Sequence, residues 1–220
     1  MIIVAVDEIS FIEASKIIDN LDSEKCMVKI GSVAFNSIGH DIVNYAAKKG
    51  FDVFLDLKLH DIPNTVKKSI EALNTLPINM LTIHISGGQD MMIAAMEAAM
   101  GTGIKIFGVT ALTSLSDNDT NNIFQRNASE QVYKMLDLAE EAGIDGVVCS
   151  PHELELVKSR KSLLSITPGI RMQDLNDDQN RVMTPKEAID LGANYLVIGR
   201  PITKSKNIRK SLNEIYESIY

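Results

Sequence analysis

The 220-residue sequence predicts a (β/α)8 barrel, on the basis of three observations. Short runs rich in Val, Ile, Leu and Phe recur along the chain, as expected of strands in a parallel sheet. Helix-like segments separate these runs, and many of them end on Gly, which commonly caps helices. The repeated units fill residues 1–220 without a linker rich in Pro, Gly or Ser, so we expect a single α/β domain.

The expected strands and helices alternate along the chain. The eight apolar runs are residues 2–7, 26–31, 51–58, 80–86, 105–112, 146–150, 164–170 and 195–201. The helix-like segments between them are residues 13–21, 41–50, 65–76, 89–103, 128–143, 152–161 and 184–193. An open doubly wound sheet is the alternative, and it is disfavoured because no strand is followed by a G-x-G-x-x-G motif.

Composition narrows the classes of partner. Apolar residues make up 45% of the chain, which is enough for a sizeable core. The net charge is −7 and the basic residues form no stripe, which argues against nucleic acid as a partner. We find no signal-peptide pattern and no apolar segment long enough to cross a bilayer, so we expect a soluble cytoplasmic protein with no membrane partner.

The cysteines and histidines do not predict a metal site. Cys26 and Cys149 lie far apart, each inside an apolar run, and we expect both to be buried thiols in a reducing compartment. The four histidines lack His-x-x-x-His or mixed Cys spacing. The sequence also holds no cofactor-lysine motif, so we expect neither a metal nor a cofactor.

Polar residues accumulate where the apolar runs end. In a (β/α)8 barrel the C-terminal ends of the strands and the loops that follow them form the functional face. We therefore expect the following side chains to gather at one opening: Asp7, Lys29, Asp56 with Lys58, His84 with Ser86, Thr113 with Ser114, Ser150, Arg171, and Gly199 with Arg200. Packing alone does not explain that distribution.

The stretch "FDVFLDLKLHDIPNT" carries the densest group of charges. Asp56 and Lys58 have the same parity on the expected strand, so both side chains point into the barrel while the neighbouring leucines point outward. Asp61 follows at the start of the loop. Structural alternatives are a simple ion pair for Asp56 with Lys58, and a helix-entry role for "HDIPNTVKK" in which Asp61 or Asn64 caps the helix.

Two lysines and three carboxylates converge when Asp7 and Lys29 are added to this group. Such an alternating array in a mostly dry site is suited to stabilising developing charge and to moving a proton.

The last two expected strands end in "TPGIR" and "VIGRP". Loops at these positions often bind phosphate, because Gly lets the backbone N–H groups approach the anion and Arg contacts it through two N–H groups. Gly169, Arg171, Gly199 and Arg200 are the candidates. The polar segment of residues 172–185 between them is either a lid over a ligand or an ordinary solvated loop.

Taken together, these motifs resemble the orotidine 5′-phosphate decarboxylases of bacterial type. The resemblance rests on "DLKLHDIPNT", "LTS", "TPGIR", "DQNRVMTP" and "VIGRP", and runs from "VAVD" near the start of the chain to "VIGRP" near its end. The shorter Asp-x-Lys-x-x-Asp pattern is also found in related sugar-phosphate barrels, such as 3-keto-L-gulonate 6-phosphate decarboxylase and hexulose-phosphate synthase.

The resemblance implies a role for each site residue. Lys58 would deliver a proton to C6 of the pyrimidine as carbon dioxide leaves orotidine 5′-phosphate and uridine 5′-phosphate (UMP) forms. Asp56 and Asp61 would face the substrate carboxylate, with Asp61, Ile62 and Thr65 supplied by the partner subunit of a homodimer. The remaining assignments are Asp7 and Lys29 to the ribose hydroxyls, Thr113 and Ser114 to the pyrimidine, and Arg171, Gln179, Gly199 and Arg200 to the phosphate.

Two alternatives remain open from the sequence. One is a sugar-phosphate decarboxylase or lyase of the 3-keto-L-gulonate 6-phosphate type, which would need a divalent metal. The other is a non-catalytic barrel that binds nucleotides without turning them over.

Overall fold

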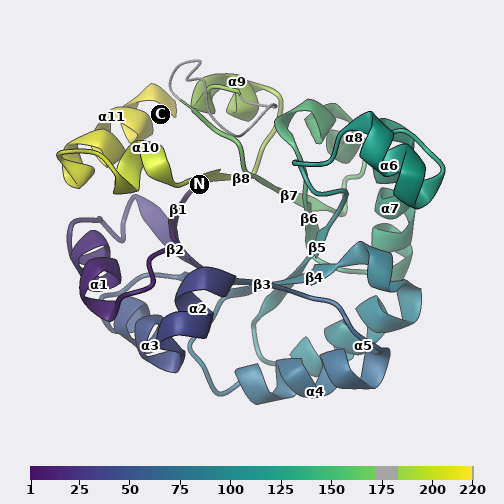
Figure 1. Ribbon diagram of the computed structural model, residues 1–220, viewed down its shortest axis with the longest axis horizontal. Helices are drawn as coiled ribbons and strands as arrows, with labels where there is room; N and C mark the ends of the chain where they lie inside the picture. The colour runs from purple at the N-terminus through teal and green to yellow at the C-terminus, as the bar shows by residue number, and fades with distance from the viewer. Residues whose placement is uncertain (172–182, 220) are drawn as a thin grey trace.

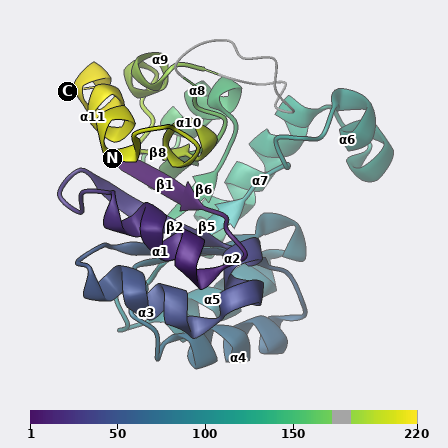
Figure 2. The same ribbon diagram turned by 60° about the vertical axis from the view of Figure 1, so that its left-hand side comes forward.

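The computed structural model describes residues 1–171 and 183–219, and its parallel strands form a closed barrel. The strands follow one another around the barrel in sequence order, and the first strand, β1 (Ile2–Val6), pairs with the last, β8 (Tyr195–Ile198), to close it. Helices surround the strands on the outside (Figure 1; Figure 2). The predicted (β/α)8 barrel is confirmed, and the open doubly wound sheet is excluded by the pairing of Ile2, Ile3 and Val4 with β8.

Each predicted apolar run contains one strand. Of the polar residues expected at the opening, four lie within strands, namely Lys29, Asp56, Lys58 and His84, and the others follow the strand ends. The bounds of the strands are β1 Ile2–Val6, β2 Cys26–Gly31, β3 Val53–Leu59, β4 Met80–His84, β5 Lys105–Val109, β6 Gly146–Val148, β7 Leu164–Thr167 and β8 Tyr195–Ile198.

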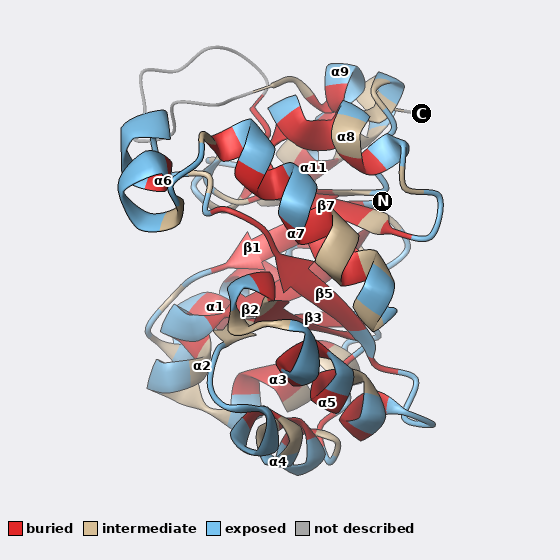
Figure 3. Cartoon of the chain, turned by 90° about the vertical axis from the view of Figure 1, so that its right-hand side faces the viewer, coloured by how far each residue is buried: buried red, intermediate tan, exposed pale blue. Residues whose placement is uncertain are grey.

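Most helices also lie where the sequence predicts them. These are α1 Phe11–Asp19, α3 His40–Lys48, α4 Pro63–Leu73, α5 Gln89–Ala99, α7 Ala128–Ala142, α8 Leu154–Lys158 and α9 Pro185–Asp190. The sequence pattern did not predict α2 Ser32–Ile38, α6 Asp117–Phe124, α10 Arg200–Thr203 or α11 Ile208–Ile219, nor the short 3₁₀ helices η1 Ile85–Gly87 and η2 Pro151–Glu153. Helix α6 is mostly exposed (Figure 3), so it carries little of the apolar periodicity that marks a packed helix.

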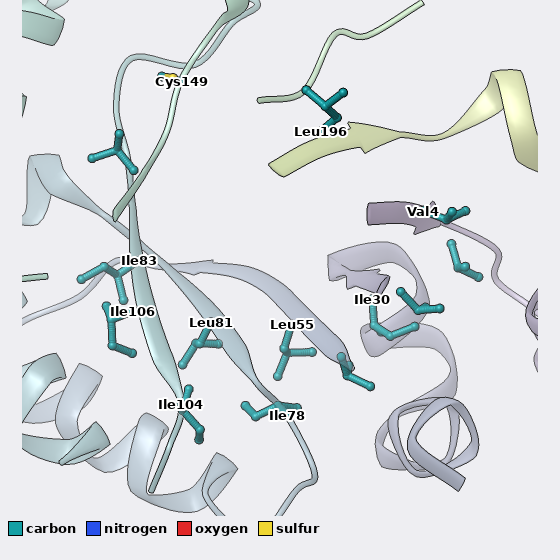
Figure 4. Close-up of a cluster of buried hydrophobic side chains, with 14 of the residues drawn as sticks. Val4, Ile30, Leu55, Ile78, Leu81, Ile83, Ile104, Ile106, Cys149 and Leu196 are labelled. Atoms are coloured by element: carbon teal, nitrogen blue, oxygen red, sulfur yellow. The ribbon is translucent and has the colours of Figure 1, made fainter. Parts of the chain in front are cut away.

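The core has two apolar layers, one on each face of the barrel wall. The outer layer joins the strands to the helices, and Figure 4 shows part of it, including Leu55, Leu81 and Ile106. The smaller inner layer fills the barrel with Ile3, Ala5, Met27, Phe54, Met80, Phe107, Ile166 and Val197. Successive residues of a strand belong to different layers because their side chains alternate, so Phe54 points inward while Leu55 points outward.

Gly146 shows how tightly the inner layer is packed. A Cβ atom at Gly146 would lie 2.3 Å from the backbone oxygen of Leu164 and 2.6 Å from the ring of Phe107. Strand β6 therefore carries glycine where the Phe107 ring fills the barrel.

Both cysteines are buried free thiols, as predicted. Burial raises the pKa of the Cys26 thiol to about 12 and raises the pKa of the Cys149 thiol as well, so both remain protonated at neutral pH. Within residues 1–171 and 183–219, no helix is both long and apolar enough to span a bilayer.

The inner layer predicts a strong dependence of stability on Ile3. Ile3 is fully buried, so Ile3→Ala should lower the free energy of unfolding by about 2–5 kcal/mol through lost burial and a cavity. Ile123 on α6 is 60% exposed, and Ile123→Ala should change the free energy of unfolding by about 0.5 kcal/mol or less. Urea unfolding of the two variants gives the comparison, and equal losses would contradict this assignment of the core.

Candidate active site

A cavity of about 320 Å³ opens at the C-terminal ends of the strands. Most of the predicted site residues line it, and these are Asp7, Lys29, Asp56, Lys58, Thr113, Arg171, Gly199 and Arg200. Its apolar lining comes from Ala5, Phe54, Val148, Ile166, Pro168 and Val197, several of which belong to the inner core layer. The site therefore has charged groups set against an apolar floor.

Asp56 lies at the centre of the charged groups. The Lys58 ammonium donates to both carboxylate oxygens of Asp56 at 2.7 Å. The Lys29 ammonium lies 3.5 Å from Oδ2 of Asp56 and donates to Oδ1 of Asp7 at 3.1 Å. The side chain of Asp56 is only 10% exposed, so this carboxylate is held in the barrel by two cations rather than by water.

The pKa of Asp56 reflects these contacts. Burial alone raises the pKa of this carboxyl, but the charges of Lys29 and Lys58 and the hydrogen bonds from Lys58 and Thr82 outweigh burial, so the pKa lies below its ordinary value. Asp56 is therefore ionised at neutral pH. The stabilisation from its paired form is present above the unfolded-state pKa of about 3.9 and is lost as pH falls through the folded-state pKa.

Strand β3 is irregular where it delivers Lys58. Leu55 pairs with Leu81 of β4, but Leu59 pairs with Ile83, so β3 contains a bulge between these two pairs. Lys58 lies in this bulge with φ of 52°, in the left-handed region that side chains other than glycine seldom adopt. The predicted convergence of Lys58 and Asp56 is confirmed, whereas the regular strand from which it was inferred is wrong at Lys58.

Thr82 on β4 is a residue beside the site that the sequence pattern did not predict. Its hydroxyl donates to Oδ1 of Asp56 at 2.9 Å and accepts the backbone N–H of Lys58 at 2.9 Å. Thr82 is fully buried. The available signal was one inward-facing polar residue inside the apolar run "MLTIHIS".

His84 and His60 lie beside this group, with ring centroids 5.2 Å apart. Burial lowers the pKa of His84, and electrostatic interactions with His60 and Lys58 lower it further, against the opposing effect of Asp56. His84 is thus neutral at neutral pH, and it adds no second charge beside the Lys58 ammonium.

The opposite side of the cavity is built from the loops after β7 and β8. Gly169 adopts a φ of 82°, and the backbone N–H of Arg171 donates to the carbonyl of Met183 at 3.0 Å. The guanidinium of Arg171 is buried and donates to the carbonyl of Ile170 at 3.1 Å, while Arg200 is exposed at the start of α10. These two arginines and the glycines are brought together as predicted.

The other predicted site residues either do not line this cavity or fall outside the described residues. Ser114 is exposed in the turn after β5 and does not line the cavity. Asp61, Ile62 and Thr65 are exposed where β3 leads into α4, and Ile62 is 67% exposed. Gln179 and most of the segment of residues 172–185 lie outside the described residues.

The helix-entry alternative for Asp61 is wrong in detail. Pro63 does occupy the first turn of α4, but the N-cap residue is Ile62, and no side chain caps the helix. Asp61 instead accepts the backbone N–H of Ile62 at 2.7 Å.

The chain matches the family described as Orotidine 5′-phosphate decarboxylase / HUMPS over residues 1–215. Orotidine 5′-phosphate decarboxylase of Saccharophagus degradans is 45% identical over 206 residues, which cover 91% of this chain and 87% of that protein. The protein of the same name from Ehrlichia canis is 43% identical over 221 residues, with 99% and 97% coverage.

A solved structure agrees with the sequence relatives. The crystal structure of orotidine 5′-phosphate decarboxylase from Lactobacillus acidophilus has a TM-score of 0.88 and 33% identity, and the match covers 99% of this chain and 98% of that one. The fold and the sequence therefore agree, and the chain belongs to the orotidine 5′-phosphate decarboxylase family of carbon–carbon lyases, as the sequence predicted.

Proposed function

We propose that this protein decarboxylates orotidine 5′-phosphate to UMP and carbon dioxide in de novo pyrimidine biosynthesis. The observation that carries the proposal is the contact of the Lys58 ammonium with both oxygens of Asp56 inside the cavity. The relatives named above carry this activity in their names.

The reaction breaks the bond between C6 of the pyrimidine and its carboxylate carbon. The carboxylate leaves as carbon dioxide, and the electron pair of the broken bond stays on C6. The Lys58 ammonium then gives C6 a proton, and solvent returns a proton to the Lys58 amine. No carbonyl adjoins C6, so the protein itself has to stabilise the carbanion, which an ammonium held beside C6 can do.

The apolar floor strengthens this electrostatic effect. Phe54, Ile166 and Val197 exclude water from one side of the cavity, so the field of the Lys58 ammonium is screened less than it would be in water. The Asp56 carboxylate also repels the substrate carboxylate, and that repulsion is relieved as carbon dioxide departs.

The phosphate of the substrate belongs at the loops after β7 and β8. Arg171, Arg200 and the glycines at 169 and 199 supply the cationic and backbone groups there, and Gln179 completes the set in our assignment. Contacts far from C6 contribute binding energy that aligns the pyrimidine over Lys58. Asp7 and Lys29 bind the ribose hydroxyls, and Thr113 with Ser114 binds the pyrimidine.

The proposal includes a homodimer in which Asp61, Ile62 and Thr65 complete the partner's site. These three residues are exposed on the single chain and do not line its own cavity. A 67% exposed isoleucine beside a carboxylate is suited to burial against a second subunit.

The direct test follows the loss of orotidine 5′-phosphate absorbance with purified protein in the presence of EDTA. Turnover that survives EDTA supports the proposal and argues against a metal-dependent sugar-phosphate lyase. Tight binding of UMP without turnover would instead support a non-catalytic nucleotide-binding barrel.

Lys58→Ala should lower kcat by at least about 10³-fold, because it removes both the proton donor and the cation beside C6. Binding of UMP, measured by calorimetry, should remain, because the phosphate contacts are unchanged. Lys105→Ala is the matched control. Lys105 is exposed at the N-terminal end of β5, away from the cavity, so this substitution should leave kcat unchanged. Near-normal kcat in Lys58→Ala would refute the role assigned to Lys58.

Arg200→Ala should lower kcat/KM for orotidine 5′-phosphate by about 10- to 100-fold, the effect of losing a charge-assisted contact to phosphate. The same variant should match the wild type on orotidine, which lacks the phosphate. Arg209→Ala, at an exposed position on α11, controls for the loss of surface charge. Equal losses on both substrates would place Arg200 outside the phosphate site.

Mixing subunits tests the shared site. Lys58→Ala and Asp61→Ala homodimers should each be nearly inactive, because every site lacks one group. After an equimolar mixture is unfolded and refolded together, hybrid dimers carry one site with both changes and one intact site. Activity should then return to about one quarter of wild type. If the mixture stays as inactive as its parents, Asp61 does not act across an interface.

A further inference from the structure

We propose that Thr82 is a positioning residue for the proposed decarboxylation. Its hydroxyl contacts both the Asp56 carboxylate and the Lys58 backbone, and so fixes the position of one relative to the other. This inference deepens the proposed function and rests on it for its kinetic readout. Thr82 does not line the cavity. Its effect on the reaction would therefore pass through the two residues that it contacts.

The hydrogen bonds of Thr82 have only one possible direction. A hydroxyl has one proton to donate and lone pairs that accept. The ionised Asp56 carboxylate can only accept, and the Lys58 backbone N–H can only donate, so the Thr82 proton points to Asp56 at 2.9 Å and its lone pair faces Lys58 at 2.9 Å. Thr82 is fully buried, so water does not compete for either bond.

The bulge in β3 explains why a side chain is needed here. The ladder between β3 and β4 is interrupted from Leu55 to Leu59, which leaves the Lys58 N–H opposite the side chain of Thr82 rather than a backbone carbonyl. Lys58 also has a φ of 52°, a conformation that persists in a non-glycine residue only when its surroundings hold it. Thr82 supplies that restraint from the neighbouring strand.

The same hydroxyl fixes the rotation of the Asp56 carboxylate. With Oδ1 bound by Thr82 and Oδ2 near Lys29, both oxygens face the Lys58 ammonium at 2.7 Å. A rotated carboxylate would release the ammonium from its position beside C6. Misplacement of a reacting group by about 1 Å can cost about 10²-fold in rate.

Thr82→Val tests the hydroxyl while preserving the branched shape. We expect kcat to fall by about 10- to 100-fold with KM changed less than about threefold, because the phosphate contacts remain and the proton donor is displaced. Thr82→Ser keeps the hydroxyl and should retain kcat within about threefold of wild type. Thr110→Val is the matched control, since Thr110 is also buried, and its hydroxyl donates to the carbonyl of Val148 at 3.0 Å.

Several outcomes would overturn the inference. The first is a kcat for Thr82→Val equal to that of Thr110→Val. The second is an equal loss of kcat in folded Thr82→Val and folded Thr82→Ser. The third is a rise in the KM of Thr82→Val without a change in its kcat. Where Thr82→Val does not fold, a folded Thr82→Ser with a large loss of kcat still refutes the role of the hydroxyl.

Crystal structures of the variants separate this inference from the proposed function. In Thr82→Val we expect Lys58 to leave the left-handed region or its ammonium to lose one oxygen of Asp56, and in Thr82→Ser we expect neither change. Unchanged geometry in Thr82→Val refutes the inference even if the wild type is active. An inactive wild type whose Thr82→Val variant loses this geometry refutes the proposed function alone.

Discussion

The site depends on one buried carboxylate held between two ammonium groups. An isolated ionised carboxylate in the barrel would carry a large desolvation penalty, and Asp56 avoids it because Lys58 contacts both of its oxygens and Lys29 lies at 3.5 Å. The lysines are held in turn by carboxylates. Removing Asp56 would leave the Lys58 ammonium without an acidic partner among residues 1–171 and 183–219, and removing either lysine would leave Asp56 with a single cation. This mutual dependence explains why charged residues occupy the ends of strands whose other residues form the core.

The barrel wall makes that arrangement possible. Alternation along β3 places Phe54 and Asp56 on the inner face, so the inner core layer becomes the floor on which the charges rest. The outer layer packs Leu55 and its neighbours against the helices and fixes the strands that carry the charges. Along β3, an outward residue such as Leu55 therefore packs against the helices, and the next residue, Asp56, faces inward and supplies charge to the site.

Periodicity predicted the strands and the convergence of Asp56 with Lys58, because both depend on which residues alternate along a chain. It did not predict the bulge at Lys58, since a register shift depends on the pairing of β3 with β4 and leaves no local pattern. Thr82 was missed for the same reason, as its role arises across two strands. Helix α6 was missed because it is mostly exposed, so its polar sequence resembles a loop. The roles of Asp61, Ile62 and Thr65 came from family resemblance, because a single chain places them on its surface.

The two lysines are not equivalent, and their difference suits the proposed chemistry. Lys29 is 11% exposed and divides its ammonium between Asp7 and Asp56, whereas Lys58 is 34% exposed and directs its ammonium to Asp56 alone among the acidic residues within the described ranges. In the proposed step Lys58 gives up its proton, and Asp56 keeps Lys29 as a cationic neighbour and stays ionised. The carboxylate then favours the return of a proton to the Lys58 amine, since a nearby negative charge stabilises an ammonium. In the proposed reaction Lys29 thus preserves the charge of Asp56 while Lys58 is neutral, and the return of a proton to Lys58 restores the same charges for the next turnover.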